Sequence, residues 1–323
     1  MTNPAVPPEV LADAEARARA RSERDWAEAD RLRAEIEAAG WKVVDRGAEF
    51  ELLPANPPDV EEEGRIRYGS SGAVPSRLDD APVGMATAVV LADDWPDDLG
   101  RLLASLTEHG PDGLQVVVVA NGPTGEQEAR LATLDEVDPG APGIETDVIW
   151  TSERLGHATA LNAGIRRAAA EVVVLLDTSI ELTGDAISPL VRALDDESVA
   201  VVGPFGIVSD DLRRFEEADP GDVDAIEAYC LAFRRSDYLA RGPLDEHFRF
   251  YRNLDIWWSL VLRDEGLDRT PRRAIALAGL PIARHEHRGW TSIPDAERDR
   301  LSKRNFYRVL DRFRDRRDLL VKG

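Results

Sequence analysis

The sequence predicts an α/β protein built on a mostly parallel sheet flanked by helices, with a small helical and hairpin module before it. Three observations lead to this expectation. Apolar runs with the length of strands alternate with amphipathic helical segments in the central part of the chain. These runs are apolar on both faces, which is typical of parallel strands that helices cover on each side. The first 53 residues show helical periodicity and then two short alternating segments.

Residues 1–53 are expected to form a unit of their own. A weak apolar stripe over about 8–22 predicts a first helix, and the spacing of apolar residues over 26–39 predicts a second. An alternating strand over 41–44, a turn, and a second alternating segment over 50–52 predict a hairpin. So small a unit buries little apolar surface, and we expect it to dock on another surface.

Residues 54–84 have the composition of a linker. They are rich in proline, glycine, serine and acidic residues and contain few large apolar ones. We therefore expect this segment to make few stabilising contacts. A domain over residues 85–323 should then fold without it.

From residue 85 the expected elements alternate between strands and helices. The i, i+3, i+4, i+7 spacing of four leucines predicts the first helix of the domain. The elements are a strand over 86–92, a helix containing Leu99, Leu102, Leu103 and Leu106, strands over 114–120 and 146–150, a helix over about 158–169, and a strand over 172–176.

Ligands of a parallel sheet bind beyond the carboxyl ends of its strands. Here that rule selects four loops, over residues 93–95, 121–125, 152–156 and 177–183. Asp177 directly follows the last of the expected strands, where a carboxylate can hold a divalent metal against a diphosphate. A carboxylate in this position is also common as a helix cap, so the motif alone leaves both interpretations open.

The composition excludes several classes of protein. The chain of 323 residues has 40 Lys and Arg against 61 Asp and Glu, a net charge of −21, so we expect no nucleic-acid partner. A single cysteine, Cys230, excludes an intrachain disulfide and a multi-cysteine metal site. Neither an uninterrupted apolar run of membrane-spanning length nor a secretory leader is visible. A cytoplasmic location without a transmembrane segment is therefore expected.

Short motifs continue the pattern along the chain. In order they are Asn121-Gly122, the segment Gly156–Gly164 with Asn162, Leu176-Asp177, Arg234-Arg235, Asp245-Glu246, Asp255 at an expected helix start, and His285. In this order the motifs resemble those of the family 2 glycosyltransferases, which have the GT-A fold, a Rossmann-like sheet flanked by helices. The resemblance covers about residues 85–291.

The resemblance implies transfer of a sugar, with inversion, from a nucleoside diphosphate sugar to an acceptor that the sequence does not identify. It places donor-binding residues in the loops and the motif helix, and acceptor-side residues farther along the chain. The donor-binding residues are then Asp93, Asn121, Arg154, Gly156, Asn162, Asp177 and Ser179. The acceptor-side residues are Asp245, Glu246, Trp257 and Trp258.

The resemblance also implies a metal site and a general base. Asp177 and the late His285 would hold a divalent cation, Mn²⁺ or Mg²⁺, against the donor diphosphate. His287, two residues on, would point to the other face of an extended segment. Asp255, before an expected helix over 256–262, would take the proton of the acceptor. The same place also suits an acid that only stabilises a helix N-terminus.

The chain departs from the family pattern at three places. Ala120 stands where the family has an Asp that contacts the donor base. Thr178-Ser179 follow Asp177 where a second carboxylate is usual, and Glu181 is the nearest replacement. Asp255 is the one carboxylate left of the acidic pair at the catalytic helix. These losses keep open a different class, a non-catalytic GT-A-like protein that binds a nucleotide or sugar or acts as a scaffold.

The two ends of the chain suggest further partners. Residues 9–53 resemble the C-terminal tail of cysteinyl-tRNA synthetases, a helical pair followed by a hairpin, while the catalytic motifs of those enzymes are absent. A synthetase-associated RNA-binding protein is thus a second alternative, which the net charge of −21 opposes. The basic segment 298–317 carries an apolar stripe that suits peripheral contact with an anionic membrane or a final helix packed on the domain.

Overall fold

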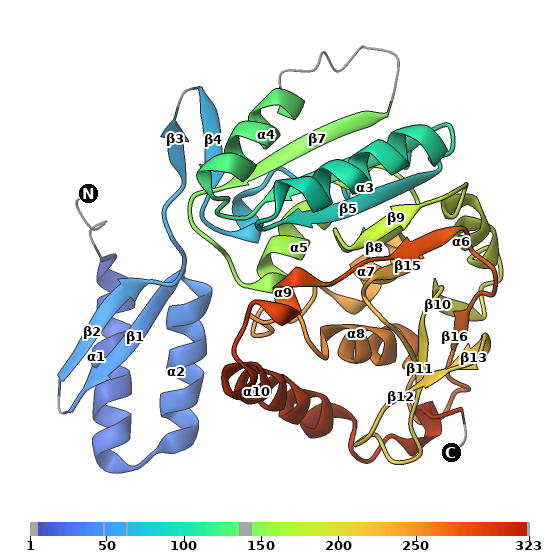
Figure 1. Ribbon diagram of the computed structural model, residues 1–323. Coiled ribbons are helices and arrows are strands. Elements are labelled where there is room, and N and C mark those ends of the chain that lie inside the picture. Colours follow the sequence, from blue (N-terminus) through green and yellow to red (C-terminus); the bar gives the residue numbers. More distant parts are fainter. Residues whose placement is uncertain (1–5, 48, 63, 136–143, 322–323) are drawn as a thin grey trace.

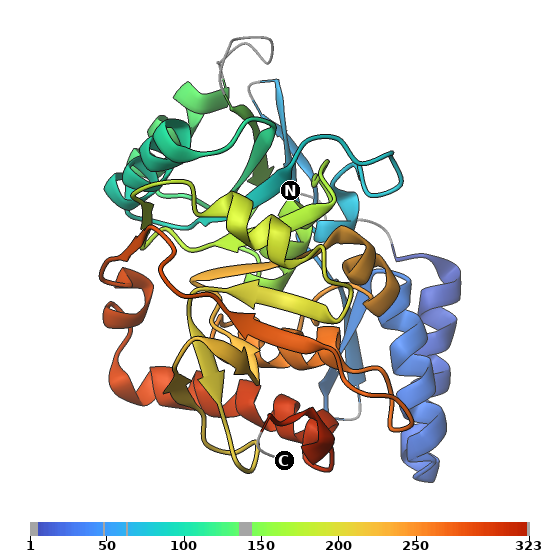
Figure 2. The same ribbon diagram turned by 90° about the vertical axis from the view of Figure 1, so that its right-hand side faces the viewer.

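The computed structural model describes residues 6–47, 49–62, 64–135 and 144–321 (Figure 1). The chain forms a small N-terminal unit and a larger α/β domain around a ten-stranded sheet. Figures 1 and 2 show the N-terminal helices, in blue, at one side of this domain. Among the helices of the described ranges, none combines the length and the apolar character needed to cross a bilayer.

The N-terminal unit has the predicted elements: α1 (Pro8–Glu23), α2 (Trp26–Ala38), β1 (Trp41–Arg46) and β2 (Glu49–Pro54). Val10 and Ile36 from the two helices pack against Trp41 in a small core of this unit. Buried Arg17 donates to both carboxylate oxygens of Asp45, at 2.8 and 3.1 Å, which holds the pKa of Asp45 below its usual range. Helices and hairpin are therefore joined by an apolar core and a bidentate ion pair.

The central sheet of the domain is mixed and mostly parallel. Strands β8, β5, β6, β7 and β4 run parallel to one another, whereas β15 is antiparallel to both of its neighbours. The bounds predicted for β5, β6 and β8 are confirmed. In spatial order the strands are β13 (Gly221–Val223), β16 (Arg273–Ala276), β10 (Val199–Gly203), β15 (Cys230–Arg234), β8 (Val172–Leu176), β5 (Ala86–Ala92), β6 (Leu114–Ala120), β7 (Glu145–Thr151), β4 (Arg65–Tyr68) and β3 (Val60–Glu62).

Helices cover both faces of the sheet, as the apolar runs predict. Along β5, Val89 faces one core while Ala88 and Val90 face the other. The face of Val90 packs against α3 (Pro96–His109), α4 (Gly125–Asp135) and α6 (Ile187–Ala193). The face of Val89 packs against α5 (His157–Ile165), α7 (Arg235–Arg241), α8 (Leu254–Arg263) and α10 (Asp295–Phe313).

Smaller elements complete the domain. The helix predicted over about 158–169 ends earlier, because the N–H groups of Arg167 and Ala168 turn to carbonyls three residues back. The remaining elements are the pair β9 (Ile180–Leu182) and β17 (Ile282–Arg284), the sheet of β12 (Glu216–Ala218), β11 (Gly206–Val208) and β14 (Ala225–Ile226), the short helix α9 (Arg288–Thr291), and 3₁₀ turns η1 (Ser71–Ala73) and η2 (Arg317–Leu319).

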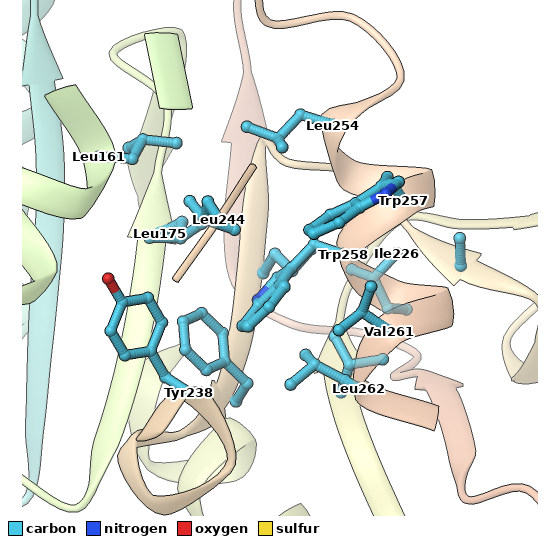
Figure 3. Packing of buried hydrophobic residues seen from close by; sticks show 14 of the residues in the cluster. Leu161, Leu175, Ile226, Tyr238, Leu244, Leu254, Trp257, Trp258, Val261 and Leu262 are labelled. Atoms are coloured by element: carbon cyan, nitrogen blue, oxygen red, sulfur yellow. The ribbon is translucent and has the colours of Figure 1, made fainter. Parts of the chain in front are cut away.

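Trp257 and Trp258 belong to α8, and Figure 3 shows both side chains among the buried residues of the core. Trp258 is 1% exposed, and its ring meets the rings of Phe233 and Tyr238 edge-on at 5.4 and 6.0 Å. The expectation that the two tryptophans face an acceptor is therefore wrong. Residues 256–263 of α8 are all buried, and the two large aromatic side chains fill space in the core.

Helix α10 also packs on the domain. Its apolar stripe includes Val309 and Phe313, which are buried in the same core as α8. Of the two interpretations of the basic C-terminal segment, the packed final helix is confirmed for these residues. The stripe that a membrane would need is covered by the domain itself.

The segment expected to be a linker differs from that expectation. Strands β3 and β4 extend the central sheet, and β4 pairs with β7. Val74 and Leu78 are buried in the domain core, and the Arg235 guanidinium donates to the carbonyl of Leu78 at 2.7 Å and to that of Asp80. The segment is held to the domain by a few buried side chains and by hydrogen bonds to its backbone carbonyls. The average composition of the segment, which suggested a linker, does not show these contacts.

Truncation tests this boundary. A chain that starts at residue 55 should keep the cooperative thermal transition of the domain. A chain that starts at residue 85 should melt at a clearly lower temperature, because it loses two buried apolar side chains and leaves the buried Arg235 guanidinium without two of its acceptors. Circular dichroism melts of both truncations provide the comparison. Equal melting temperatures of the two truncations would show that residues 55–84 are a linker that adds no stability to the domain.

Candidate active site

A cavity of about 410 Å³ lies beyond the carboxyl ends of β5, β6, β7 and β8. Each of the four loops selected from the sequence contributes to it, through Asp93, Asn121, Arg154 and Asp177. A second wall comes from residues 249–251 and from 286–293, around the short helix α9. The four loops that the strand-end rule selects therefore line one cavity.

Asn121 joins three of these loops. Its side-chain nitrogen donates to Asp93 and to the carbonyl of Leu155, both at 3.2 Å, and its oxygen accepts from the Leu155 N–H at 2.8 Å. Arg154 pairs with Asp94 at 2.7 Å. Burial raises the pKa of Asp93, although Arg154 and Asn121 oppose the shift. Asp93 thus presents a carboxyl to the cavity on a loop that Asn121 and Arg154 hold in place.

Asp177 and His287 form the polar centre of the cavity. One carboxylate oxygen of Asp177 accepts from the N–H of Ser179 at 2.9 Å and from its hydroxyl, and the other lies 3.3 Å from His287 Nε2. His287 Nδ1 accepts from the Trp290 N–H at 2.9 Å, so the ring proton is on Nε2, facing Asp177. Burial disfavours both charges, yet these contacts outweigh it: the pKa of Asp177 is lowered and that of His287 is raised.

His285 faces a different partner from the one expected. Its Nε2 lies 2.6 Å from a carboxylate oxygen of Glu181, beside the paired strands β9 and β17. The expectation that His285 meets Asp177 is therefore wrong, and Glu181 does not supply the missing second carboxylate. The two histidines do point apart, as an extended segment requires. The register of β17 against β9 decides which of them reaches Asp177.

The donor set at Asp177 fits a cation that a substrate helps to hold. Within the described ranges, no group of three or more His, Cys, Asp or Glu side chains is arranged to hold a metal. Asp177 supplies an oxygen donor to the cavity, and His287 Nε2 would supply a nitrogen donor once its proton moves to Nδ1. The Trp290 N–H would then keep the carbonyl of His287 as its acceptor, at 2.9 Å. Mg²⁺ is commonly bound by one or two protein carboxylates together with substrate phosphates and water. A two-donor site completed by a diphosphate is thus consistent with these residues.

The cavity continues inward to two further carboxylates. A chamber of about 100 Å³ shares His157, Asp177, Tyr251 and His287 with the main cavity and also has Asp255 in its lining. Asp255 lies in the first turn of α8, where its oxygens accept from the N–H groups of Ile256 at 2.9 Å and Ala228 at 3.4 Å. Burial outweighs these hydrogen bonds and raises the pKa of Asp255.

Glu227 is the second carboxylate of this chamber. Burial and the neighbouring Asp255 raise its pKa to about 7, although Arg284, 3.7 Å away, opposes the shift. The sequence analysis missed this residue. Its only signal is an acid between two short apolar segments: Glu227 directly follows β14 and comes three residues before β15. The pairing of β15 with β8 brings Glu227 to the cavity.

Two more lining residues were missed. His157 begins α5 and is buried, which lowers its pKa to about 4, so it is neutral at physiological pH. Tyr251 stacks near His287, with ring centroids 4.7 Å apart, and within the described residues its buried hydroxyl has no hydrogen-bond partner. Both reach the site from loops and helix starts whose sequence carries no metal or base motif.

Several residues expected at the site lie elsewhere. Asn162 is 1% exposed, and its amide bonds Leu244, Glu246 and Tyr238, so it joins α5 to α7 and the following loop. The other displaced residues are Glu246, which also accepts from Ser71, and Asp245, which meets His247 and Arg308. Their polar groups are used by the fold, and none lines the two cavities. Gly156 precedes α5 between Leu155 and His157, two residues that line the cavity, but is not part of the lining itself.

A mostly parallel sheet with acidic side chains beyond its strand ends is the arrangement of nucleotide-binding α/β domains. The sequence of residues 89–253 matches the family described as glycosyl transferase family 2. The match covers half of the chain, and the chain belongs to this family. The matched region begins after the N-terminal unit. The resemblance of residues 9–53 to synthetase tails therefore stays a prediction.

One solved structure supports the GT-A fold, and a second is reported beside it. The structure of GalNAc-T7 with UDP, GalNAc and Mn²⁺ aligns with a TM-score of 0.59 at 14% identity, over 73% of this chain and 50% of that chain. This protein therefore spans half the length of that structure. The mannosyltransferase PcManGT from Pyrobaculum calidifontis with GDP-Man and Mn²⁺ aligns with a TM-score of 0.47 at 20% identity, over 64% of this chain and 57% of that chain. No curated protein sequence matches the chain.

Replacing Glu227 with glutamine tests the buried carboxylate. Because its pKa is raised from 4.5 to about 7, the folded chain binds this proton more tightly than the unfolded chain does. The free energy of unfolding should therefore fall as the pH rises between these values and stay reduced above them. Glu227→Gln removes this contribution, so we expect its melting temperature to exceed that of the parent at pH 8, with the smallest difference near pH 4.5.

Thermal melts across this pH range measure the effect. Glu153→Gln is the matched control, because Glu153 is an exposed acid on the loop after β7. The control should follow the parent at every pH. A difference between Glu227→Gln and the parent that does not change with pH would contradict the raised pKa.

Proposed function

We propose that the protein is a glycosyltransferase that moves a sugar from a nucleoside diphosphate sugar to an acceptor hydroxyl, with inversion. The observation that carries this proposal is a pair of adjoining cavities that share Asp177 and His287, with Asp93 and Asn121 lining the outer one and Asp255 the inner one. A donor whose diphosphate lies at Asp177 and His287 would present its sugar towards Asp255. Membership of glycosyl transferase family 2 supports the same reaction class.

The donor end would be held by the strand-end loops. The nucleoside would lie near Asp93 and Asn121, and the diphosphate near Asp177 and His287. A bound Mn²⁺ or Mg²⁺ would neutralise charge that develops on the leaving diphosphate. Ser179 keeps one Asp177 oxygen engaged and so orients the other towards His287. Arg154 also lines the outer cavity, and its ion pair with Asp94 compensates part of its charge.

Asp255 is the proposed general base. In a single displacement the acceptor oxygen bonds to the anomeric carbon as the bond to the diphosphate oxygen breaks, and the acceptor proton passes to the Asp255 carboxylate. A carboxylate with a raised pKa accepts a proton more readily than an ordinary one. The N–H groups of Ile256 and Ala228 fix the orientation of this side chain. Glu227 shares the chamber and adds negative charge there when it is ionised.

His287→Gln tests the donor end. In Mn²⁺ we expect the variant to bind UDP or GDP at least about tenfold more weakly than the parent, because an imidazole ligand is lost. In EDTA the two proteins should bind the nucleotide alike. Isothermal titration calorimetry under both conditions gives the comparison, with His285→Gln as the matched control because His285 pairs with Glu181 instead. Equal weakening in Mn²⁺ and in EDTA would show that His287 acts without a cation.

Asp255→Asn separates an enzyme from a non-catalytic relative. The amide keeps the size of the side chain but cannot take a proton, so transfer should fall by at least about a hundredfold. Nucleotide-sugar binding should be unchanged, because Asp255 bonds the N–H groups of Ile256 and Ala228 and makes no bond to Asp177 or His287 among the described residues. Release of nucleoside diphosphate, measured with the best acceptor of a screened panel, reports the rate. Full transfer by the variant would place the base elsewhere, and a lower melting temperature without any parent activity would favour the non-catalytic alternative.

A further inference from the structure

A groove of about 490 Å³ continues from Asp255 to the surface of the domain. It shares Glu227, Arg252 and Asp255 with the inner chamber, so the two spaces meet at the proposed base. Its outer walls include Arg213 from the loop between β11 and β12 and Lys303 from α10. The groove is thus the route by which an acceptor can reach Asp255 from the side opposite the donor end.

The groove concentrates positive charge in an acidic protein. Four basic side chains line it, Arg213, Arg214, Arg252 and Lys303, although the chain as a whole has a net charge of −21. Three carboxylates share the same lining, Glu217, Glu227 and Asp255. The pKa of Glu227 is raised to about 7 by burial, so this carboxyl is partly neutral at physiological pH. The balance of the groove is therefore positive.

Most of these cations have no carboxylate partner. Within the described residues, Arg213, Arg252 and Lys303 form no ion pair, whereas Arg298 and Arg300 on the same helix as Lys303 pair with acids one turn away. Arg252 lies over the ring of Trp290 at 4.6 Å, which orients its guanidinium, and its charge acts on Asp255 and Glu227 without an ion pair to either. Unpaired cations that converge on one groove are suited to an anionic ligand.

The floor of the groove offers a further donor. Asn253, at the start of α8, donates to the carbonyl of Ser302 at 3.0 Å and so joins α8 to α10. The Ser302 hydroxyl is buried, lines the groove and has no partner among the described residues. Phe215 and Phe306 give the groove an apolar side. A ligand here would meet cations, a free hydroxyl and aromatic rings.

We propose that the acceptor carries an anionic group, a phosphate or a carboxylate, which this groove binds while the acceptor hydroxyl faces Asp255. The inference rests on the proposed function and deepens it by naming the class of acceptor. The anionic group bonds Arg213, Arg252 and Lys303, and the hydroxyl to be glycosylated enters the chamber that Asp255 and Glu227 line. The cations contribute to acceptor binding and take no part in donor binding.

Binding of small probes to the full chain tests the inference. The donor end is first filled with UDP or GDP and Mn²⁺, and sn-glycerol 3-phosphate, glycerate or glycerol is then titrated calorimetrically at low salt. The two anionic probes should bind and glycerol should not. Preference for the phosphate or for the carboxylate distinguishes the two sources of the anion. Raising the salt concentration should weaken binding, because screening reduces attraction between exposed charges.

Variants locate the site. Lys303→Gln and Arg213→Gln should each lower the affinity for the anionic probes about tenfold, which is the loss expected for one charge-assisted hydrogen bond. Arg304→Gln is the matched control: Arg304 is the exposed neighbour of Lys303 on α10, lies outside the groove, and changes the net charge equally. Melting temperatures check that all three variants fold.

The outcomes separate this inference from the proposed function. Nucleotide binding without any binding of the anionic probes would overturn the inference and leave the glycosyltransferase proposal in place. An equal loss of probe affinity in Arg304→Gln and in Lys303→Gln would show that the anions are attracted to the basic surface as a whole. That result would also overturn the inference. A chain that binds no nucleoside diphosphate would overturn the proposed function and this inference with it.

Discussion

The site depends on how β8 is buried. This strand lies between parallel β5 and antiparallel β15, and all five of its residues are buried. The backbone N–H and C=O groups of β8 are hydrogen-bonded within the sheet, and a charged side chain would be costly to bury along it. The first position that can carry a charge is therefore the end of the strand, at Asp177. The N–H of Asp177 donates to the carbonyl of Tyr229 at 3.0 Å, which ties the strand end to the segment before β15. One strand pair therefore joins the Asp177 end of the cavity to Glu227.

Charge compensation divides the cavity into two unlike ends. At the Asp177 end, His287 and Ser179 compensate the buried carboxylate and keep it ionised. Near Glu227, Asp255 accepts from backbone N–H groups alone among the residues that the structure describes, and burial raises the pKa of both carboxyls. An ionised carboxylate suits the binding of cations, and a carboxylate with a raised pKa suits proton transfer. Environment, more than residue type, gives the acids of this cavity different chemistry.

The departures from the family pattern have structural consequences that can be followed. Ser179 stands at the place of a second carboxylate, and it donates to Asp177 where an acid would have added charge. Glu181, the nearest acid, is engaged by His285 on the paired strands β9 and β17. The site thus has fewer carboxylates than the usual pattern and contains an imidazole, His287, in contact with the one that remains.

The sequence by itself determined the α/β class, the bounds of β5, β6 and β8, and the four loops that meet at the cavity, because apolar periodicity and strand-end geometry are local properties. Asp177 could be located for the same reason, whereas Asp255 was located by the resemblance of the motif order to that of the family. The tertiary structure alone decided that His287, and not His285, meets Asp177, and that Glu227 joins Asp255. It also decided that residues 60–62 and 64–83 belong to the domain. These outcomes depend on the register between strands far apart in the chain, and periodicity along one strand does not fix that register.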